Sequence, residues 1–203
     1  MRVLDRVLQN WRARMARPWI PQGAKVLDIG CHQGEFLHSL GDQIQPSVGL
    51  DPLAAADKTG RHLLFCQPFV EPLALGDASF DAVVLLATFE HIRDREPMCR
   101  ECYRLLRPGG RVIVTVPSPR VDGILAILCR LRLADGMSLE EHHGFDPRTT
   151  PELFLRTGFI LEHRHCFQLG LNHLFVFRKP GSASVTQTTD DKLQAREESL
   201  AHA

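Results

Sequence analysis

A turn flanked by glycines carries the residue types best suited to ligand binding in this chain. Apolar residues at 26–29 enclose one acid, Asp28, and Gly30 and Gly34 follow with Cys31 between them. Glycine lets a backbone turn sharply and approach a ligand without a Cβ in the way. The pattern predicts a buried strand, a tight turn and the start of a helix, whose first N–H groups are free to bind. Doubly wound α/β folds bind nucleotide-like cofactors at such a turn.

The spacing of these glycines bears on the kind of ligand. It is G-x-x-x-G, because His32 stands where the dinucleotide fingerprint G-x-G-x-x-G would place its middle glycine. On this segment alone, an ordinary strand-to-helix turn is the alternative interpretation. Histidine costs little at this position if its φ is negative, and we expect its ring to face solvent.

Composition favours one globular domain without a strong overall charge. The chain has 203 residues, with 24 Lys and Arg against 24 Asp and Glu, so its net charge draws it to neither nucleic acid nor membrane. Residues 2–16 repeat apolar side chains at helical spacing and carry arginines on the opposite face. We favour a surface helix packed on the domain edge. A lid over a cofactor, or a weak contact with an anionic surface, is the alternative.

The cysteines indicate free thiols rather than a disulfide framework. Six are scattered along the chain without a secretory signal before them, which predicts a cytoplasmic protein. Cys99 and Cys102 have the spacing of a metal or redox pair, but the pattern places them within a helix, where Cys102 shares a face with Met98 and Leu105. We therefore expect them to pack in the core. The longest apolar run is too short to span a bilayer.

Strands and helices alternate after Pro18 and Pro21 end the first helix. Strands are predicted at 24–29, 47–50, 63–66, 80–87 and 111–116, and helices at 33–40, 53–59 and 95–106. The Arg-Pro-Gly-Gly run at 107–110 is typical of a helix end with a left-handed exit. This alternation predicts an α/β fold with a doubly wound, mostly parallel sheet.

The last third of the chain has a different pattern. Residues 121–133 read as an apolar helical insertion, and 150–157 as a helix capped by Thr149 or Thr150, with Gly158 just after its end. Strands at 159–167 and 173–177 predict an antiparallel hairpin on the sheet edge. From 180 to 203 the chain has little to bury, which predicts a disordered tail. We divide the chain into an N-terminal helix at 1–21, a domain at 22–179 with an insertion at 121–145, and this tail.

Taken together, five sequence blocks resemble one known family. They are V-L-D-I-G-C-H-Q-G at 26–34, V-G-L-D at 48–51, S-F-D-A-V-V-L-L-A-T-F-E-H-I at 79–92, L-L-R-P-G-G-R-V-I-V-T-V-P at 105–117 and H-G-F-D-P-R-T-T-P-E-L-F-L-R-T-G-F at 143–159. In this order they resemble the class I S-adenosyl-L-methionine (SAM)-dependent methyltransferases, in particular the small-molecule branch often labelled methyltransferase domain 11 or 12. The resemblance covers about residues 22–178. It implies a Rossmann-like sheet, mostly parallel with an antiparallel last strand inserted, and SAM as cofactor.

The resemblance also assigns cofactor-binding residues. Asp51 stands where the family keeps the acid that holds both ribose hydroxyls, although an acid before Pro52 also suits a turn. Asp28 matches the acid that helps to orient the methionine ammonium group. Relatives often have an Asp after the third strand that accepts a hydrogen bond from the adenine amino group; here we assign this role to Gln67. The implied set is Asp28, Gly30, Cys31, Gly34, Asp51, Pro52, Gln67, Phe69, Val70 and Ala87.

Catalytic candidates lie on two loops. Glu90 and His91 follow the fourth strand, where relatives place the reacting methyl group; their alternative roles are to cap a short helix and to pack beneath it. His143 opens a family motif after the 121–145 insertion, which the family uses as a substrate lid, and could deprotonate a hydroxyl group or serve a structural role. Some quinone-biosynthesis relatives bind a divalent metal through E-x-x-E-H here. Ala87 replaces the first Glu, so we expect no metal.

The resemblance implies in-line transfer of a methyl group from SAM to a small-molecule acceptor held close and dry. We prefer an oxygen acceptor because two histidine-bearing loops border the expected pocket. The apolar insertion suits an aromatic, lipid-like or polyketide-like acceptor, or is simply core. We expect neither nucleic acid as a partner nor stable membrane insertion. The alternative is a non-catalytic protein of this fold that acts as a binding or assembly partner.

Overall fold

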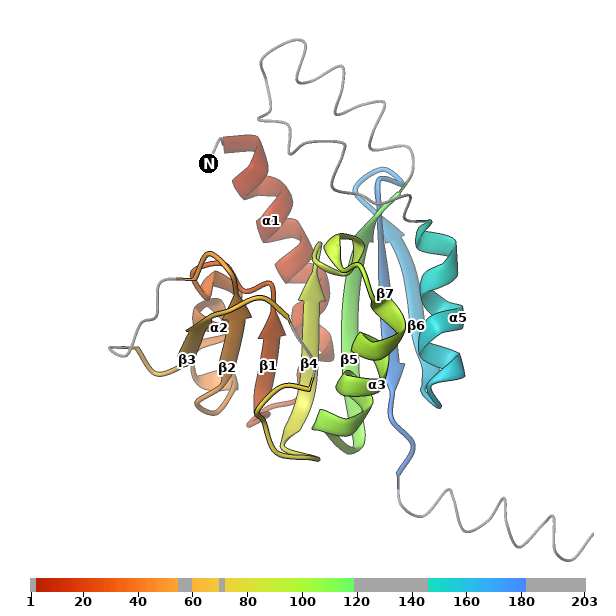
Figure 1. The fold of residues 1–203 in the computed structure, drawn as a ribbon. Coiled ribbons are helices and arrows are strands. Elements are labelled where there is room, and N and C mark those ends of the chain that lie inside the picture. Colours follow the sequence, from red (N-terminus) through yellow and green to blue (C-terminus); the bar gives the residue numbers. More distant parts are fainter. Residues whose placement is uncertain (1–2, 55–59, 70–71, 119–145, 182–203) are drawn as a thin grey trace, which may run out of the picture.

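A single mixed sheet organises the molecule (Figure 1). The computed structural model describes residues 3–54, 60–69, 72–118 and 146–181. Its seven strands lie in the order β3-β2-β1-β4-β5-β7-β6. Strands β1 to β5 pair in parallel, whereas β7 is antiparallel to both β5 and β6. The predicted doubly wound sheet with an antiparallel strand inserted near its edge is confirmed.

The elements follow the predicted alternation closely. The strands are β1 (Val26–Ile29), β2 (Val48–Asp51), β3 (Leu63–Cys66), β4 (Phe80–Leu86), β5 (Leu106–Pro117), β6 (Ile160–Phe167) and β7 (Asn172–Arg178). The α-helices are α1 (Val3–Ala16), α2 (Glu35–Leu40), α3 (Arg95–Leu105) and α5 (Thr150–Arg156). The short 3-10 helices are η1 (Arg17–Trp19), η2 (Gly41–Gln43), η3 (Phe89–His91) and η5 (Pro147–Thr149).

Helices cover both faces of the sheet. One apolar cluster joins α1 and α2 to the sheet through residues such as Ala16, Leu37 and Val84. The other joins α3 and α5 to the opposite face and includes Cys102 and Phe154. Near-continuous burial of β4 between these clusters explains its apolar sequence, since a parallel strand covered on both faces needs no polar side. Because β1, β2 and β4 run in parallel, their carboxyl ends meet at one edge of the sheet.

The left-handed exit predicted at 107–110 is confirmed at Gly109, but the start of the following strand, predicted at 111, was wrong. Helix α3 ends at Leu105, and the buried Leu106 already pairs with Phe80, so the strand starts before the glycines. The pairing shifts between Phe80 and Ala82, so the Arg-Pro-Gly-Gly run forms a bulge inside β5. Gly109 is left-handed there, with φ +81°.

Thr149 stands at the N-cap position of the last helix, as predicted, but its side chain does not cap the helix. Thr149 has helical backbone angles and no capping side-chain bond, because η5 precedes α5. Asp146 caps η5 instead, and its carboxylate accepts the Arg148 N–H at 2.9 Å. Gly158, at φ +99°, follows the helix as expected.

Cys99 and Cys102 are fully buried, as expected of core residues. The predictions for 55–59, 121–145 and 182–203, and those on Val70 and His143, fall outside the described residues. Within the described ranges, no helix is both long and apolar enough to span a membrane. The cytoplasmic location and the division into segments stay predictions.

Candidate functional site

Two pockets meet at the carboxyl edge of the sheet, and both touch Gly30. The inner pocket has a volume of about 80 Å³ and lies on the α1 side; it is lined by Gln9, Asn10, Arg12, Ala13, Asp28, Gly30, Cys31, Glu35, Phe36, Ser39 and Leu86. The outer pocket has a volume of about 480 Å³; it is lined by Ile29, Gly30, Leu50, Pro52, Pro68, Phe69, Thr88, His91, Ile92, Arg93 and Asp94. The edge predicted from the sequence as a cofactor site is therefore hollow on both sides of the glycine turn.

Gly30 is required by its surroundings as well as by its conformation. Its φ is +81°, and a Cβ added there would lie 2.1 Å from Thr88 Oγ1. The turn after β1 is thus pressed against the loop after β4. Gly34 is left-handed as well, with φ +77°, and a Cβ there would lie 3.1 Å from Leu64.

His32 occupies the turn in the conformation that we had expected it to avoid. Its φ is +49°, not negative, so the assumption on which its low cost rested was wrong. Its N–H donates to Asp51 Oδ2 at 2.9 Å, and its ring Nδ1 lies 2.9 Å from Glu35 Oε1. The ring is about half exposed, 51%. Contacts to two carboxylates thus hold His32 in a left-handed conformation in which glycine would be less strained.

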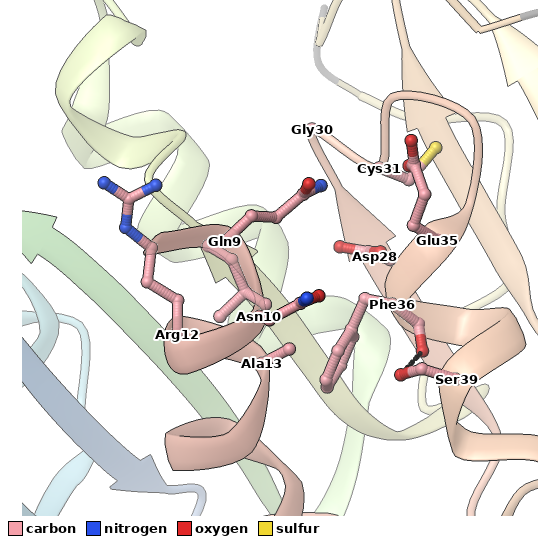
Figure 2. Close-up of a pocket in the computed structure, with 11 residues that line it drawn as sticks. Gln9, Asn10, Arg12, Ala13, Asp28, Gly30, Cys31, Glu35, Phe36 and Ser39 are labelled. Carbon is pink, nitrogen blue, oxygen red and sulfur yellow. Dashed lines mark hydrogen bonds between the residues drawn. The ribbon is translucent and has the colours of Figure 1, made fainter. Parts of the chain in front are cut away.

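Asp28 forms the polar floor of the inner pocket (Figure 2). The residue is only 2% exposed, and no described group donates a hydrogen bond to its carboxylate. Burial first, and then the charges of Asp51 and Glu35, raise the pKa of Asp28 to about 7. Three carboxylates around one turn create a negative potential, which favours a cationic ligand.

Helix α1 forms the opposite wall of this pocket. Figure 2 shows Gln9 extending from α1 toward Gly30, and Asn10 toward Phe36. The helix is held from the far side as well, since Gln168 Nε2 donates to the Leu8 carbonyl at 3.0 Å. The favoured interpretation of a surface helix on the domain edge therefore needs correction, because α1 also lines the pocket.

The outer pocket has mostly apolar walls. Pro52 and Phe69, both predicted, line it, whereas Gln67 does not. Asp51 lies at the end of β2, and both of its carboxylate oxygens accept backbone N–H groups, from His32 and, at 2.7 Å, from Leu53. The carboxylate is therefore held in one orientation.

The loop after β4 carries the predicted catalytic pair. Ala87 is left-handed, with φ +55°, and its N–H reaches Thr115 O and Oγ1, each at 3.0 Å. Strained residues of this kind cluster at functional sites. Glu90 is 2% exposed, with a buried Oε2 that has no hydrogen-bond partner. Burial raises its pKa to about 7, against the opposing charges of Arg12 and Arg95. His91 lines the outer pocket.

Sequence reasoning missed several of the lining residues. Thr88 was not among the predicted site residues, although its side chain packs against the glycine turn at Gly30. Glu35 was read only as part of a helix, although an acid in the first turn after a glycine pair was a usable signal. Gln9 and Asn10 gave no signal at all, because the docking of α1 depends on tertiary contacts.

A metal site finds no support among the described residues. No group of three His, Cys, Asp or Glu side chains there could hold a metal ion. The absence of a metal stays a prediction, since the chain continues beyond those residues.

Comparison with known proteins gives this geometry a family. A methyltransferase domain model matches residues 27–114. The rat mitochondrial ubiquinone biosynthesis O-methyltransferase is 30% identical over 64% of this chain and 41% of its own. A Mycolicibacterium smegmatis protein named "Probable S-adenosylmethionine-dependent methyltransferase" is 32% identical over 70% of this chain and 60% of its own. The chain thus spans about half the length of these curated relatives.

Solved structures show the same fold. An S-adenosylmethionine-dependent methyltransferase from Mesorhizobium loti superposes with a TM-score of 0.60 at 17% identity, covering 82% of this chain and 95% of its own. The [4+2]-cyclase SpnF does so with a TM-score of 0.65 at 16% identity, covering 84% of this chain and 81% of its own. At such identities the fold alone is shared. Fold, family model and relatives agree, and the chain belongs to the class I SAM-dependent methyltransferase family.

Proposed function

We propose that this protein is a SAM-dependent methyltransferase that acts on a small-molecule acceptor. The observation that carries the proposal is the Asp28 carboxylate at the inner pocket, whose pKa is raised by burial first and then by the charges of Asp51 and Glu35. SAM carries a sulfonium and an ammonium group, and this arrangement of carboxylates suits a cation. SAM supplies the methyl group when bound.

The residues present fit the other parts of the cofactor. The inner pocket offers the amides of Gln9 and Asn10 and the backbone of the glycine turn to the methionine portion. Asp51, with its carboxylate fixed by two N–H groups, is assigned to the ribose hydroxyls. The apolar walls of the outer pocket, Phe69 among them, suit the adenine ring.

An oxygen acceptor is the more specific part of the proposal. The rat relative is named an O-methyltransferase, which supports oxygen as the methylated atom. Methylation of a hydroxyl group releases a proton, and a base with a pKa near the working pH serves this best. Glu90, with its pKa raised to about 7, and His91, at the outer pocket, are the candidates on the described loops.

Calorimetry with SAM and with S-adenosylhomocysteine tests the proposal. We expect the unmodified protein to bind both and Asp51→Ala to weaken binding at least tenfold. Glu152→Ala serves as the matched control, because this carboxylate is exposed on α5 and pairs with Arg156 of the same helix. No binding by the unmodified protein would refute the proposal. Binding without methyl transfer to any of a broad panel of acceptors would favour the non-catalytic alternative.

A further inference from the structure

A third cavity lies beyond the end of β5, on the face covered by α5. Its volume is about 270 Å³, and it is lined by Ser118, Pro147, Arg148, Arg164, Cys166, Gly170 and His173. Its place on this face follows from two contacts of Phe175, a core residue beneath α5. The Arg164 guanidinium lies 5.6 Å from the Phe175 ring centre, and the His173 ring lies 6.0 Å from it.

Among the described residues that line this cavity, the charged side chains are arginines and none is a carboxylate. Among the residues that the structure describes, neither Arg148 nor Arg164 forms an ion pair. Asp146, the neighbouring acid in sequence, directs its Oδ1 to the Arg148 backbone N–H instead. His173 adds a buried Nδ1 that has no hydrogen-bond partner. Two guanidinium groups beside an unsatisfied imidazole nitrogen are matched by an anion that accepts several hydrogen bonds.

The cavity lies close to the loop after β4, at the carboxyl edge of the sheet. Ser118 follows the end of β5, three residues after Thr115, which holds the Ala87 N–H. An extended chain rises about 3.3 Å per residue, so the cavity begins about 10 Å from the loop after β4. That separation is roughly the length of a substituted aromatic ring with a charged group at one end.

We propose that this cavity binds the anionic group, a carboxylate or a phosphate, of the methyl acceptor. The acceptor is then an anionic small molecule, anchored at Arg148 and Arg164 while its nucleophile reaches the loop after β4. The anion site stands on its own geometry. Its assignment to the acceptor rests on the proposed function.

Cys166 provides a direct readout of the anion site, because its exposed thiol lines the cavity. Rates of alkylation by anionic iodoacetate and neutral iodoacetamide are compared by peptide mass spectrometry. Cys66, exposed on β3 away from the cavity, is the internal control. We expect the iodoacetate-to-iodoacetamide ratio to be at least threefold higher at Cys166. Arg148→Gln and Arg164→Gln should each lower it at least twofold and leave the ratio at Cys66 unchanged.

Protection experiments distinguish the two anions. Millimolar benzoate or phenyl phosphate should slow the reaction of Cys166 with iodoacetamide, whereas neutral benzamide should not; the stronger protector identifies the preferred group. Equal ratios at the two cysteines, together with no protection by either anion, would overturn the anion site whether or not the protein transfers methyl groups.

The acceptor assignment has its own test. Methyl transfer from SAM is measured with 3,4-dihydroxybenzoate and with its methyl ester. We expect kcat/KM to favour the acid at least tenfold, and Arg164→Gln to remove that preference while SAM affinity is unchanged. Equal rates for acid and ester would overturn the assignment and leave the anion site standing. No transfer to either, with SAM bound, would count against the acceptor role and the proposed function together.

Discussion

The carboxylate of Asp51 accepts the backbone N–H of His32 at 2.9 Å, so the last residue of β2 fixes the turn after β1. The same carboxylate accepts the Leu53 N–H at 2.7 Å. One side chain therefore ties two loops together at the sheet edge. This contact also explains how a histidine is held at φ +49°.

The left-handed conformation of His32 predicts that glycine is better accommodated there. A non-glycine residue in this region costs on the order of 1–3 kcal/mol. Glycine removes this cost, but it loses more conformational freedom on folding, which offsets part of the gain. We expect His32→Gly to raise the free energy of unfolding by about 1 kcal/mol, measured by urea denaturation. His165→Gly, on the edge strand β6, is the control and should lower it. Equal losses in both variants would contradict the strain argument.

Comparing Gly30 with Gly109 separates the cost of a close contact from the cost of a left-handed backbone. Gly30→Ala must place a Cβ against Thr88, whereas Gly109 has the same φ of +81° with nothing within 4 Å. We expect Gly109→Ala to cost about 1–2 kcal/mol for backbone strain alone. Gly30→Ala should cost at least about 2 kcal/mol more, because the loop after β4 must move. Thermal unfolding of both variants measures the difference; similar losses would show that the contact with Thr88 is soft.

The pKa of Asp28, raised to about 7, predicts that cofactor affinity depends on pH. The charged form of Asp28 attracts a cation, so binding favours deprotonation and SAM affinity should fall up to tenfold from pH 7 to pH 6. Calorimetry in buffers of different ionisation enthalpy should show proton release near pH 7. Asp28→Asn should flatten the profile and leave only the titration of the ligand itself. An unchanged profile in this variant would remove Asp28 as the cause.

Glu90 predicts a stability change of defined sign. Its pKa in the folded state is about 7, above the ordinary value of 4.5, so its contribution to stability is complete below about pH 4.5 and is lost as the pH rises through 7. Glu90→Gln should therefore be more stable than the unmodified protein at pH 8, with the gap closing toward pH 4.5. Urea denaturation across this range measures it. Glu152→Gln, at an exposed site, should show no such trend.

Local patterns in the sequence were sufficient for the sheet but not for the walls of the pocket. An apolar run predicts a buried strand such as β4, because both faces of such a strand are covered. The left-handed His32 could not be foreseen, since its conformation depends on Asp51, which is distant in sequence. The bulge before Arg111 was missed because the buried Leu106 pairs with Phe80 of β4, again a tertiary effect. Residues on α1 were missed for the same reason.

The packing of the N-terminal helix has an optical consequence. The chain contains two tryptophans, Trp11 on α1 and Trp19 just after it in η1. The Trp19 ring lies 4.6 Å from the ring of His163 on β6. Since α1 also lines the inner pocket, all indole emission arises from this helix and the 3-10 turn directly after it. Intrinsic fluorescence therefore offers a label-free signal for ligand entry, one that isolates this helix from the rest of the molecule.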